Sequence, residues 1–302
     1  MMMLRVVMLG SLLLGGALAQ GPVREALQKP GMPVGQKPAM QGVLQQGVPK
    51  SMAPKLSAEA KAAFGEARQL EEGSRKVTGP ARSRKLELAA LAFDRLVTKF
   101  ELEPQVAAQA AWCAAELWRR HGSAPLAEKD YLFAAKSHAV RYGQRALLAA
   151  GDMQRRQLRR EVAMKTYAKA EAVDPRTGRA QSARLWIARI LLADGKVDQA
   201  IERFQGALES APSPRQAIDA ADYLAKAWVV KGDLESAGFV IDHAEKVVDG
   251  EQHGDPIVAE QLRRACQRMG AKKALRRALD QKNDTAKDAV RLDEHRRSKA
   301  GK

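Results

Sequence analysis

The side chains that could do chemistry are few and scattered in this 302-residue sequence. The five histidines stand at positions 121, 138, 243, 253 and 295. His243 and His253 flank an expected turn and lack the third ligand or carboxylate cluster that a metal site needs. The sequence therefore predicts ordinary histidines and no metal site.

Two aspartates form the one pattern that could suggest acid–base chemistry. Asp219 and Asp222 are three residues apart, which places both carboxylates on one face of a helix. A solvated helix face, or a pair that contacts a ligand, is favoured over a catalytic pair. The sequence also lacks G-x-S-x-G, H-E-x-x-H, a Walker-type phosphate loop and G-x-G-x-x-G after a strand. We therefore expect a protein that is not an enzyme and has no cofactor.

Positive charge is the strongest chemical bias of the chain. Lys and Arg number 51 against 35 Asp and Glu, a formal net charge of +16. Two dense clusters contribute: Arg155, Arg156, Arg159 and Arg160, and then Arg263, Arg264, Arg268, Lys272, Lys273, Arg276 and Arg277. Each cluster is either a solvated helix face, which is slightly favoured, or a surface for an anionic partner.

The rest of the composition indicates a helical chain. Hydrophobic residues make up 45% of the sequence, enough for a core, but aromatic residues only 5%, which argues against a β-sandwich or barrel. The abundant residues are helix formers such as Ala, Leu, Arg and Glu. Between residues 57 and 280 the prolines stand where helices would begin or end, and Ser57 is predicted to cap the first helix.

This helical region repeats. An alanine recurs at a spacing of 37 residues, followed by a large residue four positions later and a second small residue seven positions later. The three triplets are Ala163, Tyr167 and Ala170; Ala200, Phe204 and Ala207; and Ala237, Ile241 and Ala244. Residues three and four apart share a helix face, so the small residues let a neighbouring helix approach and the large one fills the space between them.

A first helix and a turn precede each triplet. Residues 183–193 form the clearest first helix, followed by a glycine-containing turn at residues 194–196. The next copy turns at residues 231–233, again around a glycine, which suits the left-handed conformation after a helix. Between residues 126 and 173 the break stays open: it falls at Gly143 or at Gly151, or one helix is long.

The pattern resembles the tetratricopeptide repeat (TPR) family. Residues 182–214 match best, with the family's positions at Ile187, Ala188, Leu191, Gly195, Ala200, Phe204, Ala207 and Pro212. Arg184 stands where the family usually has Trp. Residues 91–118 look like TPR proteins of the bacterial envelope, including those associated with the Tol-Pal system. The resemblance covers roughly residues 60–280 and implies an all-α, TPR-like right-handed solenoid of about six helical hairpins.

In a TPR stack the first helices line a concave groove that binds a partner. Trp112, Trp186 and Tyr223 hold matching positions on first helices, and are candidates for that groove together with Arg189 and Lys226. Packing of the rings against the neighbouring repeat is the alternative and is slightly favoured.

The same register separates the two cysteines. Cys113 and Cys266 fall on first helices of the second and sixth pairs. A disulfide needs Cα atoms within about 7 Å, and repeats of a solenoid touch only their neighbours. We therefore expect two unpaired thiols.

The ends of the sequence predict an exported protein with flexible flanks. Residues 1–19 combine Arg5, a short apolar run and an Ala-x-Ala ending, the layout of a signal peptide cleaved before Gln20; an uncleaved anchor is the alternative. Residues 20–56, rich in Pro, Gly and Gln, are predicted to be a disordered linker, residues 57–280 the repeat domain and residues 281–302 a basic tail. No later segment is apolar enough for a membrane span, so none is expected after signal cleavage.

Together these features predict a non-catalytic scaffold for protein–protein interaction in the cell envelope, periplasmic or secreted. Its partner would be a protein or peptide bound in the concave groove. The alternative is a basic surface module that binds an anionic polymer or a membrane face. Nucleic acid is an unexpected partner, because an exported protein meets little of it.

Overall fold

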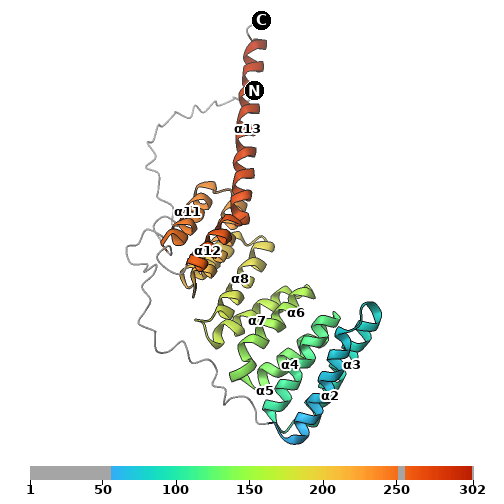
Figure 1. Ribbon diagram of the computed structural model, residues 1–302. Helices are drawn as coiled ribbons and strands as arrows, with labels where there is room; N and C mark the ends of the chain where they lie inside the picture. Colours follow the sequence, from blue (N-terminus) through green and yellow to red (C-terminus); the bar gives the residue numbers. More distant parts are fainter. Residues whose placement is uncertain (1–55, 251–255, 301–302) are drawn as a thin grey trace, which may run out of the picture.

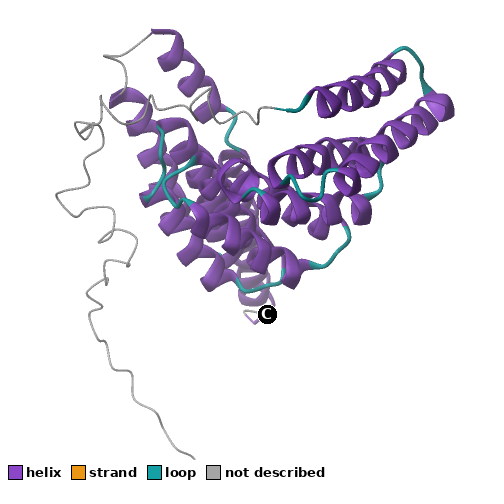
Figure 2. Cartoon of the chain, turned by 90° about the horizontal axis from the view of Figure 1, so that it is seen from below, coloured by secondary structure: helices purple, strands orange, loops and turns teal. Residues whose placement is uncertain are grey.

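The computed structural model describes residues 56–250 and 256–300. Within these ranges the chain consists of helices and loops, without strands (Figure 2). The predicted signal peptide and the predicted linker as far as residue 55 lie outside the described residues. The predicted fold class is confirmed, because the helices form an all-α, TPR-like solenoid.

The helices follow one another along a curved stack from α2 to α13 (Figure 1). Within the described ranges they form six pairs in chain order: α2 (Ala58–Arg75) with α3 (Gly79–Lys99), α4 (Pro104–His121) with α5 (Ala124–Ser137), α6 (Gln144–Arg156) with α7 (Arg160–Val173), α8 (Gly178–Ala193) with α9 (Val197–Glu209), α10 (Pro214–Lys231) with α11 (Leu234–Gly250), and α12 (Pro256–Gln267) with α13 (Gly270–Ala300). From α2 to α11, each helix packs on the helices next to it in sequence. The stack is therefore held together by contacts between neighbours.

Helix ends follow their sequence signals. Ser57 caps α2, because its Oγ accepts a hydrogen bond from the backbone N of Ala60 at 3.1 Å. The turns after α8 and α10 contain Gly195, with φ 75°, and Gly232, with φ 88°, the left-handed conformation expected of them. Proline lies in the first turn of α3, α4, α5 and α10, where its missing N–H leaves no helical bond unmade.

The repeated triplets form the core of the stack. All their predicted positions are buried: Ala163, Tyr167, Ala170, Ala200, Phe204, Ala207, Ala237, Ile241 and Ala244. Two buried glutamines add polar ties between the helices of a pair. Gln144 Nε2 donates to the carbonyl of Ala170 at 3.1 Å, and Gln181 Nε2 donates to the carbonyl of Ala207 at 2.8 Å. Both the apolar contacts and the glutamine hydrogen bonds therefore recur at a spacing of 37 residues.

The region between residues 126 and 173 contains two breaks. A π-helical turn, η2 (Ala139–Gly143), separates α5 from α6, so Gly143 marks a helix boundary. The interpretation of Gly151 as a break is wrong, because Gly151 lies inside α6, where a Cβ would come within 2.6 Å of the ring of Tyr167. The turn before α7 instead uses Leu158, with φ 61°. A leucine in this conformation is rare and gives no sequence signal.

The first helices of the pairs form the inner layer of the stack. α6 contacts α8 and α8 contacts α10, whereas the second helices α5, α7 and α9 stand farther apart from one another. The more closely spaced layer lies on the inside of a curve. Therefore α4, α6, α8 and α10 line the concave face, and α5, α7 and α9 line the convex face.

The last pair departs from this pattern. Both α12 and α13 pack against α10 and α11. Asp222 of α10 caps α13, since its Oδ1 accepts a hydrogen bond from the backbone N of Ala271 at 2.8 Å. Helix α13 then runs on to Ala300 without a break at residue 280, and it projects beyond the stack (Figure 1).

The two cysteines belong to different parts of the core. Cys113 on α4 packs with the hydrophobic cluster of α2 to α6, and Cys266 on α12 lies in the cluster formed by the later helices. Burial raises the pKa of the Cys113 thiol to about 11. A thiol with so high a pKa is a poor nucleophile at neutral pH.

Candidate functional site

Aromatic rings and cations alternate along the concave face. The guanidinium carbons of Arg155 on α6 and Arg189 on α8 each lie 3.9 Å from the ring centroid of Trp186. The same carbon of Arg189 lies 4.8 Å from the ring centroid of Tyr223 on α10, and Lys226 Nζ lies 5.1 Å from that ring. We call these five residues the cation–aromatic ladder. It connects α6, α8 and α10 across three successive repeats.

The two rings of the ladder pack against buried rings of the core. Tyr167 stacks with Trp186, with ring centroids 6.4 Å apart and an angle of 10° between the planes. Phe204 stacks with Tyr223 at 5.7 Å and 11°. Both buried rings are the large members of the repeated triplets. Because the core fixes the outer rings, the cations that stack on them lose little further freedom when they bind a ligand.

A second cluster of the same chemistry lies nearer the N-terminal end of the stack. The guanidinium carbon of Arg145 lies 4.2 Å from the ring centroid of Trp112 and 4.2 Å from that of Tyr142. Burial lowers the pKa of Arg145, and the positive charges of Arg141 and Arg179 lower it further. We call Trp112, Tyr142 and Arg145 the Arg145 cluster.

Carboxylates are sparse beside these cations. Within the part of the chain that the structure describes, no carboxylate lies within ion-pair distance of Arg145 or Arg189. Arg155 has one acidic neighbour, Asp152, at 3.8 Å. The Nε atoms of Arg145 and Arg155 are buried without a hydrogen-bond partner. The concave face therefore carries guanidinium groups whose charge this chain leaves largely uncompensated.

In the two preceding repeats, an acid stands at the position of Arg189 and accepts a hydrogen bond from a tyrosine. Tyr131 Oη donates to Glu116 Oε1 at 2.6 Å, and Tyr167 Oη donates to Asp152 Oδ1 at 2.7 Å. In both pairs the acid precedes the tyrosine by fifteen residues, and burial raises the pKa of each phenol. These carboxylates are therefore held by their own repeat.

One repeat later, both members of the pair change. Arg189 stands in the position of Asp152, and Phe204 stands fifteen residues after it without a hydroxyl group. The next repeat has Lys226 and Ile241 at these positions. A cation thus replaces the acid in both repeats: Arg189 has no described carboxylate partner, whereas Lys226 pairs with Asp222.

A hollow of about 290 Å³ opens between α8 and α10 on the ladder. Its lining residues are Ser182, Leu185, Trp186, Arg189, Asp219, Asp222 and Tyr223. The two aspartates that could have formed an acid–base pair have structural partners. Asp219 pairs with Arg215 at 3.3 Å, and Asp222 pairs with Lys226 at 2.5 Å besides capping α13. Both carboxylates therefore have a cation of their own helix as partner.

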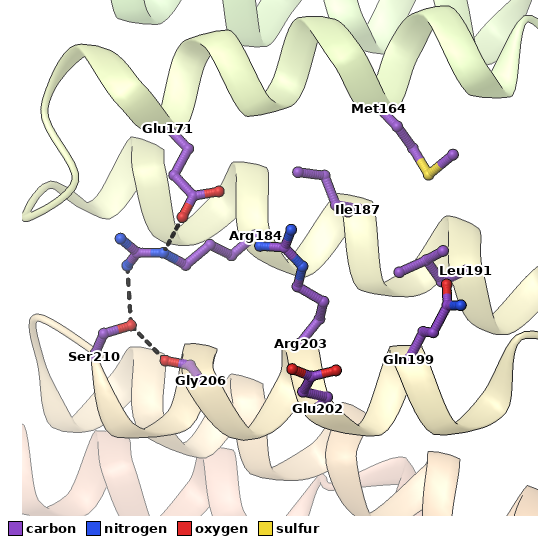
Figure 3. Close-up of a pocket in the computed structure, with 10 residues that line it drawn as sticks. All are labelled: Met164, Glu171, Arg184, Ile187, Leu191, Gln199, Glu202, Arg203, Gly206 and Ser210. Atoms are coloured by element: carbon purple, nitrogen blue, oxygen red, sulfur yellow. Dashed lines mark hydrogen bonds and ion pairs between the residues drawn. The ribbon is translucent and has the colours of Figure 1, made fainter.

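A larger hollow, of about 740 Å³, lies on the convex face, where residues of α7, α8 and α9 line it (Figure 3). Met164, Ile187 and Leu191 form its apolar part. At one end Arg184 Nε donates to Glu171 at 2.9 Å, and its Nη1 donates to Ser210 at 3.0 Å. Arg184 therefore ties three helices together, whereas Glu202 and Arg203 also line the hollow, are exposed and form no ion pair among the described residues.

The first predicted basic cluster is divided among internal partners. Arg155 belongs to the ladder, Arg159 pairs with Glu128 at 2.8 Å, and Arg160 pairs with Asp194 at 2.5 Å. Arg156 is exposed and forms no ion pair among the described residues. The four arginines therefore do not form one continuous free surface.

The second predicted cluster is partly paired. Arg263 and Arg264 share Glu260, each at 2.7 Å, and Lys272 pairs with Glu245 at 2.5 Å. The remaining members are exposed and form no ion pair within the described ranges: Arg268, Lys273, Arg276 and Arg277. Arg268 lies in the turn between α12 and α13 and lines, with Arg264, Asp219 and Asp222, a hollow of about 420 Å³ between α10 and α12. Lys273, Arg276 and Arg277 are exposed on α13.

The predicted groove residues all lie on first helices: Trp112, Trp186, Arg189, Tyr223 and Lys226. Their rings pack against neighbouring elements, as the favoured alternative predicted, because Trp186 stacks with Tyr167 and Tyr223 stacks with Phe204 of the preceding pair. The cations of this chain already lie over their rings, so guanidinium and ammonium groups, rather than bare rings, face a partner.

Two residues with the same cation–aromatic geometry, Tyr142 and Arg145, are not among the predicted groove residues. A signal was present: a cation follows an aromatic residue by three positions in Tyr142–Arg145, Trp186–Arg189 and Tyr223–Lys226. The described residues contain no group of three metal-ligating side chains, and no described helix combines the length and hydropathy of a membrane span.

Comparison with known proteins gives a likeness of fold. No family model and no curated protein matches the sequence. Among solved structures, MamA from Desulfovibrio magneticus RS-1 is 14% identical with a TM-score of 0.48, over 66% of this chain and 99% of that one. YrrB, a TPR protein with an unusual peptide-binding site, is 18% identical with a TM-score of 0.43, over 68% and 92%. PilF of Pseudomonas aeruginosa is 18% identical with a TM-score of 0.44, over 73% and 90%.

Proposed function

We propose that this protein is a non-catalytic interaction scaffold that binds a segment of a partner protein along its concave face. The observation that carries the proposal is the cation–aromatic ladder. Its side chains are half-buried, face the inside of the curve and span three repeats on a closely packed core. Rigid positioning of cations and rings along a curved surface suits an elongated partner, because few side chains need to be ordered on binding.

The proposal extends to location. The layout of residues 1–19 supports export, and the resemblance of residues 91–118 supports a bacterial envelope protein of the Tol-Pal-associated type. Export would place the scaffold in the periplasm or outside the cell. N-terminal sequencing of protein recovered outside the cytoplasm tests this, and a chain that still begins with Met1 would contradict it.

A basic surface that binds an anionic polymer or a membrane face is the second candidate. The observation that favours it is the exposed group on α12 and α13, above all Lys273, Arg276 and Arg277. Such binding depends on charge alone and should weaken steeply as salt rises. Binding on the ladder includes contact with fixed rings and should weaken less.

A pull-down with matched variants tests the main proposal. The full chain, a Trp186→Ala/Arg189→Ala variant and a Val162→Ala control serve as bait for envelope extract. Val162 is exposed on the second helix α7, away from the ladder. A partner retained by the parent chain and the control, and lost from the double variant, supports binding on the concave face. Identical partners for all three baits would contradict it.

A further inference from the structure

We propose that the segment bound on the concave face is acidic, with carboxylates at alternate positions that pair with Arg155 and Arg189. This inference rests on the proposed function and adds the chemistry of the partner. It follows from three features of the ladder: the largely uncompensated guanidinium groups, their spacing, and the aspartates between them.

The guanidinium groups have little internal counter-charge. Arg189 forms no ion pair among the described residues, and Arg155 has a single carboxylate at 3.8 Å. Both guanidinium carbons lie 3.9 Å from the ring centroid of Trp186, and both arginine side chains are half-buried rather than sealed in the core. A guanidinium presents its N–H groups along the edge of its plane. A carboxylate accepts two parallel N–H bonds from such an edge, which makes it the matching partner.

The spacing of the two arginines fits an extended chain. Both guanidinium carbons lie 3.9 Å from one ring centroid, so they are no more than about 8 Å apart. In an extended segment, side chains at positions i and i+2 point to the same side and are about 6.5–7 Å apart. Two acidic residues separated by one other residue can therefore reach Arg155 and Arg189 together.

The aspartates between the cations argue against a uniform polyanion. Asp152 lies beside Arg155, and Asp219 and Asp222 line the hollow next to Arg189. A polymer with a negative charge at every unit would place some of its charge against these carboxylates. A protein segment can place neutral or apolar residues there, for instance against Leu185 in the same hollow.

A random dodecapeptide library, selected on the full chain, tests the inference. Binders that are retained by the parent chain and lost by Arg189→Gln are sequenced. We expect enrichment of Asp and Glu in these binders, with the acid-x-acid spacing most frequent. Arg189-dependent binders without acidic enrichment would overturn the inference and leave the proposed function standing. If no binder depended on Arg189 or Trp186, the proposed function itself would fall.

A selected acidic peptide then gives the magnitude. Loss of one bidentate charge-assisted pair corresponds to roughly ten- to hundred-fold weaker binding, and we expect this for Arg189→Gln in fluorescence anisotropy. Arg189→Lys should recover part of the affinity, because it restores the charge without the planar fork. Arg95→Gln, an exposed arginine on α3 outside the ladder, should stay within about two-fold of the parent chain.

Two further measurements keep the result interpretable. Thermal melts of each variant show whether Arg189→Gln remains folded, and the partial recovery by Arg189→Lys must appear at unchanged stability. Inorganic polyphosphate is titrated in parallel. If polyphosphate bound more tightly than the acidic peptides and with the same dependence on Arg189, the ligand would be an anionic polymer and the inference would be wrong.

Discussion

Two helical glycines should respond in opposite ways to the same substitution. Gly206→Ala in α9 should stabilise the fold by about 0.5–1 kcal/mol, because alanine is the better helix former. A Cβ at residue 206 would meet nothing within 4 Å. Gly151→Ala in α6 gains the same helix propensity but places its Cβ 2.6 Å from Tyr167 Cε1 and 2.7 Å from Cδ1.

The ring of Tyr167 cannot yield cheaply. It is fully buried, its hydroxyl donates to Asp152 at 2.7 Å, and it stacks with Trp186. Overpacking of this kind costs about 1–3 kcal/mol, so Gly151→Ala should end between neutral and about 2 kcal/mol destabilised. The difference between the two variants is then about 1–3 kcal/mol, or roughly 2–12 °C in melting temperature at 2–4 °C per kcal/mol.

Thermal melts followed by circular dichroism, with tryptophan fluorescence alongside, decide the matter. The fluorescence of Trp186 should change in Gly151→Ala, because its stacking partner must move, and should stay as in the parent chain in Gly206→Ala. If Gly151→Ala proved as stable as Gly206→Ala, the close approach of α6 to α7 at Tyr167 would be wrong.

Three further outcomes follow from the core. Burial and the nearby carboxylate of Asp94 raise the pKa of Asp130 to about 7, above its value of 3.8 in an unfolded chain, so its ionisation should cost stability as the pH rises through that range. Asp130→Asn should therefore raise the melting temperature more at pH 8 than at pH 4. Ala207→Leu should destabilise the stack by about 1–3 kcal/mol in denaturant melts, because Ala207 is fully buried at a helix contact; an unchanged midpoint would show that no helix packs there. Thiol labelling of unfolded, non-reduced protein should count two free thiols, and a bridge between Cys113 and Cys266 would contradict their placement on α4 and α12.

The repeat architecture was predictable because its cause is local. A small–large–small triplet at a 37-residue spacing describes one helix contact made again and again, and every such position proved to be buried. The turn before α7 was not predictable. It depends on Leu158 in a left-handed conformation. Leucine rarely adopts this conformation, so the residue type does not indicate it.

The candidate site was predictable only in part, because some of its contacts cross from one repeat to the next. The register alone places Trp186, Arg189, Tyr223 and Lys226 on first helices, as the structure has them. The contribution of Arg155 could not be predicted, because it comes from the preceding repeat and reaches Trp186 only through the packing of α6 against α8. In sequence it belongs to a run of arginines of which Arg159 and Arg160 pair with Glu128 and Asp194.

Asp152 and Arg189 occupy the same position in successive repeats but differ in charge and in their partners. Asp152 is engaged by the hydroxyl of Tyr167, so its charge serves the repeat in which it lies. Arg189 occupies the same position one repeat later, where Phe204 cannot donate a hydrogen bond and no described carboxylate pairs with the guanidinium. Tyr167 and Phe204 are both fully buried large members of the repeated triplets. The unpaired Arg189 guanidinium lies between the rings of Trp186 and Tyr223, and the carboxylate of the proposed acidic partner would supply the counter-charge that this repeat lacks.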